Sequence, residues 1–313
     1  MSDTLQKFML ETGNVRGELV ELRGVWQQAL EHHHYPAPVQ ALLGQMLAAA
    51  ALLTANLKFD GALIMQIHGD GPVRLLVVEC DTNLRLRATA KLIPDAIIDT
   101  NANITQLINA NGNGHFAITL DPTDRLPGQQ PYQGIVALEG DSMAAIIETY
   151  MLRSEQLDTK LWLAADAQVA RGLLLQRLPE NGGNTATLSE ASHELTQEAW
   201  QRMVALGSTL KTAELLTTNT STLLHRLFWE ETLRVFDPLS VQFHCGCNRD
   251  KVGNMLKMLG QAEVQEALVE QGQLSIACDF CGKEYSFDKV DCAQLFASNA
   301  PAETLLPPSP AQH

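Results

Sequence analysis

The N-terminal part of the chain has the hydrophobic pattern of a sheet covered by helices. Short apolar or β-branched runs alternate with clusters of Gly, Asp, Asn and Pro, a spacing typical of antiparallel strands joined by tight turns. The predicted strands are Val15–Leu22, Ala62–His68, Val73–Cys80, Leu84–Leu92, Phe116–Leu120, Gln133–Leu138, Leu161–Ala165 and Arg171–Leu178. Residues 1–178 are therefore expected to form one α+β domain, a sheet with helices against it.

One predicted helix of this domain is apolar on all sides. The stretch Ala41–Leu53 is rich in Ala and Leu, and Pro38 precedes it at a position where the missing proline N–H is harmless. The stretch is shorter than the 18 or so apolar residues that a membrane span needs, and Gln45 interrupts it. We therefore predict a buried core helix and no interaction with a membrane.

Residues 179–234 follow a different pattern. Pro179–Asn184 has the composition of a linker, and no strand pattern follows it. Apolar residues then recur every three or four positions among many polar ones, as at Leu188, Ala191, Leu195 and Ala199. This pattern predicts helices with a modest apolar stripe, which need another surface to pack on. The segment is either a simple helical connector or a cover able to detach from the first domain.

The candidate chemistry lies near the C-terminus. Four of the six cysteines form two close pairs, Cys245 with Cys247 and Cys278 with Cys281, and thirty residues separate the pairs. Four thiolates without another donor favour a closed tetrahedral zinc site that has no open position for catalysis. Three interpretations remain open from the residues alone: a structural zinc ribbon, a redox switch using the same thiolates, and a disulfide framework.

The surroundings of the second pair support a zinc knuckle. Leu274–Ala277 is predicted to be a strand that enters it and Glu284–Phe287 a strand that leaves it. Gly282 follows the last cysteine, where a positive φ lets backbone N–H groups point at sulfur. Residues 235–297 are accordingly predicted to be a small zinc-binding domain, and the proline-rich residues 298–313 a disordered tail.

Composition limits the possible partners and compartment. The net charge of −14 and the lack of any basic run argue against a nucleic-acid surface. The first 14 residues are too polar for a secretory signal, and cysteines clustered for metal in such a chain indicate the reducing cytoplasm. No phosphate loop, dinucleotide fingerprint or nucleophile elbow is present.

Other candidate residues are assigned no chemistry at this stage. Cys80 is predicted to be a small core or edge residue of a strand, and Cys292 a buried helix residue outside the two pairs. His68, His115 and His225 lie in apolar patterns without an evident catalytic partner, so packing is the expected role.

The chain resembles the redox-regulated heat-shock holdases of thirty-three kilodaltons over nearly its whole length. The most specific segment is Val235–Pro238 followed by the two cysteine pairs, which match all four positions of the family's zinc cluster. Other matching segments are Arg16–Val20, Leu57–Gly61, His68–Pro72, Tyr132–Val136, Leu138–Asp141 and Arg153–Leu157. Cys80 and Cys292 lie outside that cluster.

The resemblance implies an ATP-independent chaperone, not an enzyme, so no catalytic residue is assigned. It implies that the reduced protein holds one Zn²⁺ through Cys245, Cys247, Cys278 and Cys281 and is inactive. It further implies that oxidation gives a disulfide within each close pair, with zinc release and unfolding of the linker. The expected active form is a homodimer that binds unfolded or partly folded client proteins.

Two other classes of function compete with this expectation. A thiol–disulfide oxidoreductase could use Cys278 and Cys281, although that motif usually stands alone at a helix N-terminus. A zinc ribbon that binds nucleic acid is disfavoured by the acidic balance of the chain.

Overall fold

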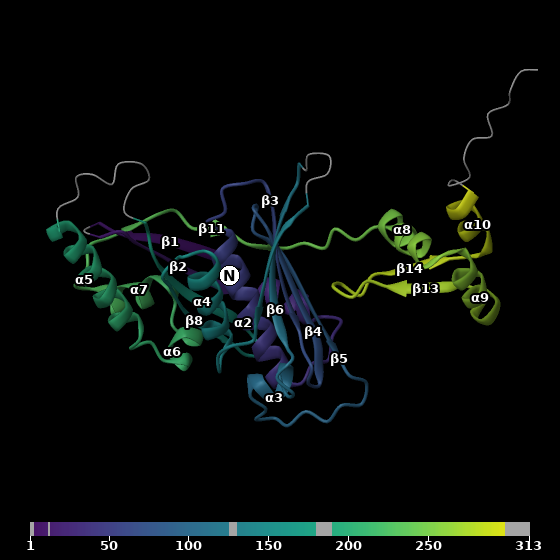
Figure 1. Cartoon of the computed structure of the whole chain (residues 1–313), viewed down its shortest axis with the longest axis horizontal. Coiled ribbons are helices and arrows are strands. Elements are labelled where there is room, and N and C mark those ends of the chain that lie inside the picture. Colours follow the sequence, from purple (N-terminus) through teal and green to yellow (C-terminus); the bar gives the residue numbers. More distant parts are fainter. Residues whose placement is uncertain (1–2, 12, 125–129, 180–189, 298–313) are drawn as a thin grey trace, which may run out of the picture. The chain divides into compact units, whose positions relative to one another are not determined.

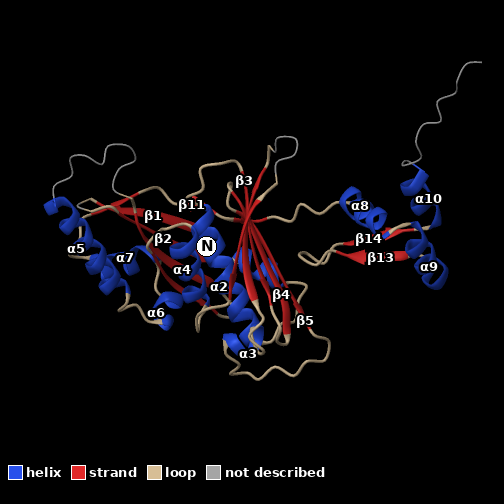
Figure 2. Ribbon diagram, viewed as in Figure 1, coloured by secondary structure: helices blue, strands red, loops and turns tan. Residues whose placement is uncertain are grey.

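The computed structural model describes residues 3–11, 13–124, 130–179 and 190–297 (Figure 1). Two compact units divide the chain, the first ending at Cys245 and the second beginning at Gly246. Both contain strands and helices (Figure 2), which confirms the predicted α+β class. The domain boundaries expected at 178 and 234 both fall within the first unit and stay predictions. The expected tail, 298–313, lies outside the described residues.

The first unit contains two six-stranded sheets. Sheet A comprises β1 (Thr4–Leu10), β2 (Val15–Leu22), β8 (Thr159–Ala165), β9 (Ala170–Arg177), β10 (Leu233–Val235) and β11 (Leu239–Ser240). Its strand order is β10-β1-β2-β9-β8, and β11 also pairs with β1. Sheet B comprises β3 (Gly61–His68), β4 (Val73–Asp81), β5 (Arg85–Leu92), β6 (His115–Pro122), β7 (Tyr132–Ala137) and β12 (Gln242–Phe243). Its strand order is β12-β5-β4-β3-β6-β7. Among the described strands, the pairing of β12 with β5 is the one parallel pairing.

Helix α2 (Ala37–Thr54) forms the centre of the larger core. It packs on β2, β8 and β9 of sheet A and on β3, β4 and β5 of sheet B, and it lies between the two sheets in Figure 1. By length and hydropathy this helix could cross a membrane, but 72% of it is buried inside the protein. The prediction of a buried core helix is confirmed. The same unit contains α1 (Gly24–Leu30), α3 (Ile104–Ile108) and α4 (Met143–Ser154).

Three helices cover the other face of sheet A, and we call them the α5–α7 layer. They are α5 (Glu190–Gly207), α6 (Thr212–Thr217) and α7 (Thr220–Phe228). Their buried residues, among them Met203 and Leu227, form a second core with Leu173 of β9. Alternate side chains of a strand point to opposite faces. Consequently Leu174 packs in the α2 core while Leu173 packs under the α5–α7 layer.

The second unit is small. It contains α8 (Arg249–Leu259), α9 (Gln261–Gln271), the hairpin of β13 (Leu274–Ala277) and β14 (Glu284–Phe287), and α10 (Lys289–Ala297). Its buried core includes Leu256, Leu268, Tyr285 and Phe287. Both predicted strands are present, and Cys292 lies on α10 at 3% exposure as expected.

Four strands were not predicted from the sequence. β1 was missed because the polar residues at its start mask the alternation that follows. β10, β11 and β12 have two or three residues each, too few for any periodic pattern. They form because the chain passes beside β1 and β5 at positions where backbone groups can pair.

A carboxylic acid is buried where β1 and β2 meet the end of α2. The side chain of Glu18 is 1% exposed, and its Oε1 lies 4.0 Å from the ammonium of Lys7. Burial raises the pKa of Glu18 to about 7, although the charges of Lys7 and Arg16 and a hydrogen bond from Asn56 oppose the shift. A group whose pKa is higher in the folded state stabilises the fold below its unfolded pKa. That stability is lost as the pH rises through the folded value.

We therefore expect the first unit to lose stability between pH 5 and pH 8, by up to about 3 kcal/mol from Glu18 alone. Glu18→Gln should remove this slope, since an amide does not ionise. Urea unfolding followed by tryptophan fluorescence measures the effect, because Trp26, Trp162, Trp200 and Trp229 all lie in the first unit.

The matched control for this experiment is Glu139→Gln, which changes an exposed carboxylate beside Arg153. This variant should keep the slope of the wild-type protein. Equal slopes in the Glu18→Gln variant and the wild-type protein would contradict the assignment.

Candidate metal centre

The structure brings the two cysteine pairs together. The Sγ atoms of Cys245, Cys247, Cys278 and Cys281 all lie within 4.8 Å of one another, and all four residues are partly buried. Cys247 Sγ and Cys281 Sγ, one from each pair, are 3.4 Å apart. Among the described residues this is the one group of three or more His, Cys, Asp or Glu side chains whose donor atoms converge.

The second pair is positioned by the turn of the β13–β14 hairpin. Cys278 N–H donates to the carbonyl of Lys283 (2.9 Å), and Gly282 N–H donates to the carbonyl of Cys278 (2.8 Å). Gly282 has φ of 65°, in the left-handed region that glycine adopts without strain. The expected positive φ at this residue is confirmed. Both sulfurs of this pair lie in the tight turn, within 4.8 Å of each other.

The residues after the first pair are fixed by the start of α8. Asn248 caps this helix, accepting a hydrogen bond from the backbone N–H of Lys251 at 2.8 Å. The ammonium of Lys251 in turn donates to the carbonyl of Gly246, between the two cysteines, at 2.8 Å. Cap and ammonium together constrain the backbone that carries Cys247.

Tyr285 of β14 contacts the site from within the β13–β14 hairpin. Its hydroxyl donates a hydrogen bond to Cys247 Sγ at 3.2 Å, while its ring packs in the small core of the second unit. The hydrogen bond to Cys247, together with burial and the charges of the cysteines, raises the pKa of Tyr285 to about 12. Tyr285 therefore remains a donor over the whole physiological pH range.

Cys245 ends the first unit and is held by sheet B. His244 N–H donates to the carbonyl of Leu86 at 2.9 Å, which extends the pairing of β12 with β5 toward the cysteine. On β5, Arg87 makes two hydrogen bonds to Glu79 and directs Nη1 at Cys245 Sγ, 3.7 Å away. The Arg87 guanidinium is thus a charged donor to this sulfur.

The donor set fits a tetrahedral zinc ion. Four thiolates about 2.3 Å from one ion would lie roughly 3.8 Å from one another, within the observed spread of the sulfurs. Charge-assisted and neutral donors to Cys245 and Cys247 are the outer contacts that commonly orient metal-binding thiolates. The arrangement can hold a metal ion by four sulfurs, and it can also form disulfides.

Cys80 and Cys292 lie outside the metal centre. Cys80 is fully buried on β4, and burial raises the pKa of its thiol to about 12. Burial also raises the pKa of Cys292 on α10. Neither thiol forms the reactive thiolate readily.

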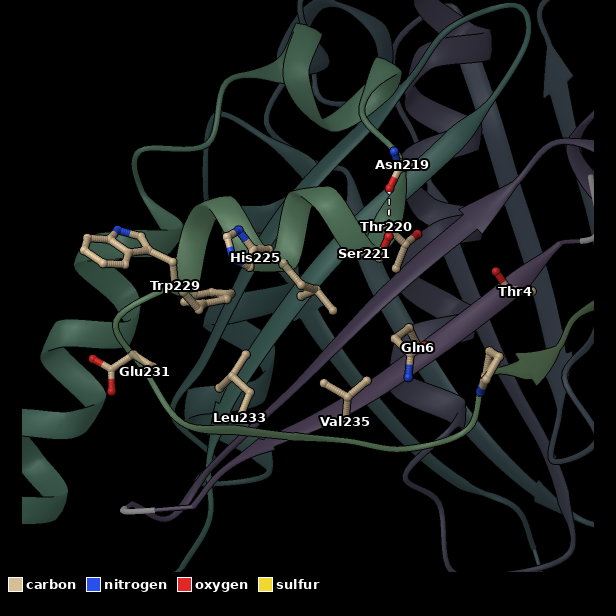
Figure 3. Close-up of a pocket in the computed structure, with 13 residues that line it drawn as sticks. Thr4, Gln6, Asn219, Thr220, Ser221, His225, Trp229, Glu231, Leu233 and Val235 are labelled. Carbon is tan, nitrogen blue, oxygen red and sulfur yellow. Dashed lines mark hydrogen bonds between the residues drawn. The ribbon is translucent and has the colours of Figure 1, made fainter.

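Three histidines were assigned packing roles from the sequence. His68 and His115 are direct partners across β3 and β6, and their rings stack with centroids 4.7 Å apart, a pairing that the sequence did not reveal. His225 lines a groove of about 560 Å³ that runs along α7 beside β1 and β10. Figure 3 shows the groove with His225 and Trp229 on one side and Gln6 and Val235 on the other.

The chain is similar to known proteins over nearly its whole length. Residues 3–288 match the model of the Hsp33 protein family. The 33 kDa chaperonin of Chromobacterium violaceum is 48% identical over 94% of both chains, and that of Methylobacillus flagellatus is 44% identical over 100% of this chain and 99% of its own. The crystal structure of the 33 kDa chaperonin (heat shock protein 33 homolog) from Thermotoga maritima covers 94% of this chain and 98% of its own, with a TM-score of 0.76 at 22% identity.

The fold and the converging cysteines define a two-unit α+β protein with a cluster of four cysteines that could hold a metal ion. The family match and the relatives above then identify it further. This chain belongs to the Hsp33 family of chaperones, as its resemblance to the thirty-three-kilodalton holdases indicated. The likeness to the Thermotoga maritima structure supports the same fold.

Removing the tyrosine hydroxyl tests the outer contact to Cys247. In Tyr285→Phe the sulfur loses its donor while the ring still fills the core, so we expect metal affinity to fall roughly 10- to 100-fold. Competition of the reduced protein with a chromogenic zinc chelator measures this affinity. Tyr132→Phe, which removes an exposed hydroxyl in the first unit, should bind zinc as the wild-type protein does. An unchanged affinity in Tyr285→Phe would show that its hydrogen bond is incidental.

Proposed function

We propose that this protein is a redox-regulated, ATP-independent holdase that is inactive when reduced and metal-bound. Oxidation of Cys245, Cys247, Cys278 and Cys281 activates it. The observation that carries the proposal is the convergence of these four sulfurs in a family of chaperones. Zn²⁺ is the metal that four thiolates favour. When bound, it would join the ends of the cysteine segments and contribute folding energy to the second unit.

The second unit depends on its metal because its own core is small. The core consists of a few buried side chains, including Leu256 and Phe287. A zinc site of this type contributes ~10–16 kcal/mol, against a total stability of about 5–15 kcal/mol for an ordinary domain. Disulfides within each close pair would close very short loops and restrict the unfolded chain little. Oxidation should therefore unfold this unit.

Hydrogen peroxide can serve as the oxidant, because it accepts all the electrons that the thiolates lose. In each pair, two thiolates lose two electrons as one S–S bond forms, Cys245 with Cys247 and Cys278 with Cys281. Peroxide accepts those electrons with two protons from solvent, its O–O bond breaks, and two waters result. Sulfurs in a disulfide are poor ligands, so the four cysteines no longer hold the ion.

The activated form exposes apolar surface in the first unit. The linker expected at residues 179–234 includes the α5–α7 layer, whose buried face covers sheet A. Detachment of this layer would uncover Phe8, Leu19 and Leu173, and the buried face of the layer itself. A large exposed apolar surface is what binds unfolding proteins. The expected partners are thus unfolded clients and, in the active state, a second copy of this chain.

The oxidoreductase alternative is less well supported by the site. Cys278 and Cys281 lie in the turn of a two-stranded hairpin, whereas the pair of an oxidoreductase usually stands at a helix N-terminus. We propose that the protein is not an enzyme, acts in the reducing cytoplasm, and does not bind nucleic acid, in keeping with its charge of −14.

The proposal predicts coupled changes on treatment with peroxide at mild heat stress. The reduced protein should contain one zinc per chain and should not suppress aggregation of a denatured client. After treatment, zinc should be released, four thiols should be lost, and ATP-independent suppression of aggregation should appear. Zinc release, thiol titration and light scattering measure these changes on the same sample.

Cysteine variants provide the matched controls. Cys278→Ser should abolish zinc binding, whereas Cys80→Ala, which removes a thiol outside the centre, should respond like the wild-type protein. Zinc retained after treatment, or released without any gain of holding activity, would leave the four cysteines with a structural role only.

A further inference from the structure

A charged side chain lies on the apolar face of sheet A that the α5–α7 layer covers. Arg171 of β9 occupies the face that also presents Leu173 and Leu175 to this layer, and its side chain is 1% exposed. Directly across the ladder on β2 is Glu21, and the Nη2 atom of Arg171 lies 3.1 Å from its Oε2. A fully buried arginine in an apolar interface requires an explanation beyond packing.

The guanidinium of Arg171 also reaches the helical layer. Nη1 donates a hydrogen bond to the backbone carbonyl of Thr218, and Nη2 donates to Thr220 Oγ1 at 3.3 Å. These two residues form the junction between α6 and α7, where Thr218 ends one helix and Asn219 caps the next. The same junction borders the groove along α7, where Figure 3 labels Thr220 and Asn219.

The contact with the junction is directional, in contrast to the apolar contacts around it. Leucine side chains can slide on a sheet with little loss of energy, because hydrophobic burial is proportional to area and has no preferred direction. A hydrogen bond from a guanidinium to one carbonyl fixes a single position. Arg171 therefore determines where the α6–α7 junction sits on sheet A.

The ion pair under the junction carries a desolvation cost in the closed form, which the hydrogen bonds to the junction offset. Burial lowers the pKa of Arg171 against the opposing effect of Glu21, and its Nε is buried without a hydrogen-bond partner among the described residues. Desolvation of a buried ion pair offsets much of its attraction, and hydration restores that loss when the cover leaves. After release Glu21 keeps Arg171 and Arg23 as partners, at 3.1 and 2.7 Å in the closed form.

We propose that Arg171 is a positioning residue that clasps the α6–α7 junction to sheet A and keeps the α5–α7 layer closed in the reduced protein. This inference rests on the proposed function, because closure of that layer is what keeps the chaperone inactive. Arg171 holds one backbone carbonyl of the layer, so removal of its side chain opens the junction without unfolding the sheet beneath it.

This role is tested by hydrogen exchange of the Arg171→Met variant, measured on the reduced, zinc-loaded full chain. Backbone amides of α6 and α7 should exchange roughly 10- to 100-fold faster than in the wild-type protein, since the lost bond involves a charged donor. Amides of β2 and β9 should exchange as before, and zinc content should remain one per chain. Suppression of client aggregation should appear without oxidant.

Two further variants keep the test specific. Arg171→Lys retains the charge beside Glu21 but lacks the fork that reaches both Glu21 and Thr218, so it should open the junction as well. Arg153→Met removes an exposed arginine of α4 that pairs with Glu139, and it should exchange like the wild-type protein.

Several outcomes would overturn the inference. Unchanged exchange in α6 and α7, wild-type behaviour of Arg171→Lys, or faster exchange that includes β2 and β9 equally would each show that Arg171 has no specific role at the junction. The proposed function is judged separately. If the oxidised wild-type protein fails to suppress aggregation, that function is wrong, while the exchange data still decide whether Arg171 holds the junction.

Discussion

Sheet A is apolar on both faces, and each face therefore has to be covered. Alternate residues of β9, such as Leu173 and Leu174, belong to two different cores. Helix α2 covers one face and is itself buried between two sheets, so it cannot leave without destroying the unit. The α5–α7 layer covers the other face from outside. Sheet A therefore has one cover enclosed within the unit and one external cover, the α5–α7 layer, which buries an apolar face.

The second unit, by contrast, has little core of its own, so its stability depends on what happens at the four cysteines. Cys247, Cys278 and Cys281 belong to a unit whose buried side chains form one small cluster. In such a unit a metal cross-link through four sulfurs would be comparable to the whole folding free energy. A chemical change at the sulfurs is then a change in folding. This is the physical basis of the thiol-oxidation switch that we propose.

An ionisable side chain is buried under each of the two covers of sheet A. Glu18 lies on the α2 side and Arg171 on the side of the α5–α7 layer. Each carries a desolvation cost in the interior, which raises the pKa of Glu18 and lowers that of Arg171. Each also forms specific contacts, Glu18 with Lys7 and Arg171 with the carbonyl of Thr218. Apolar burial supplies most of the stability, and the charged residues fix where the elements meet.

The sequence by itself determined the α+β class, the buried α2, the two strands that flank the second cysteine pair and the four cysteines that converge. Local patterns suffice for these features, because hydrophobic periodicity and turn residues such as Gly282 act over a few positions. Only the tertiary structure decided the pairing of β10, β11 and β12, the stacking of His68 on His115, and the contacts of Arg171 and Tyr285. These depend on strand register and on side chains far apart in the chain, and no local pattern specifies which distant residues meet.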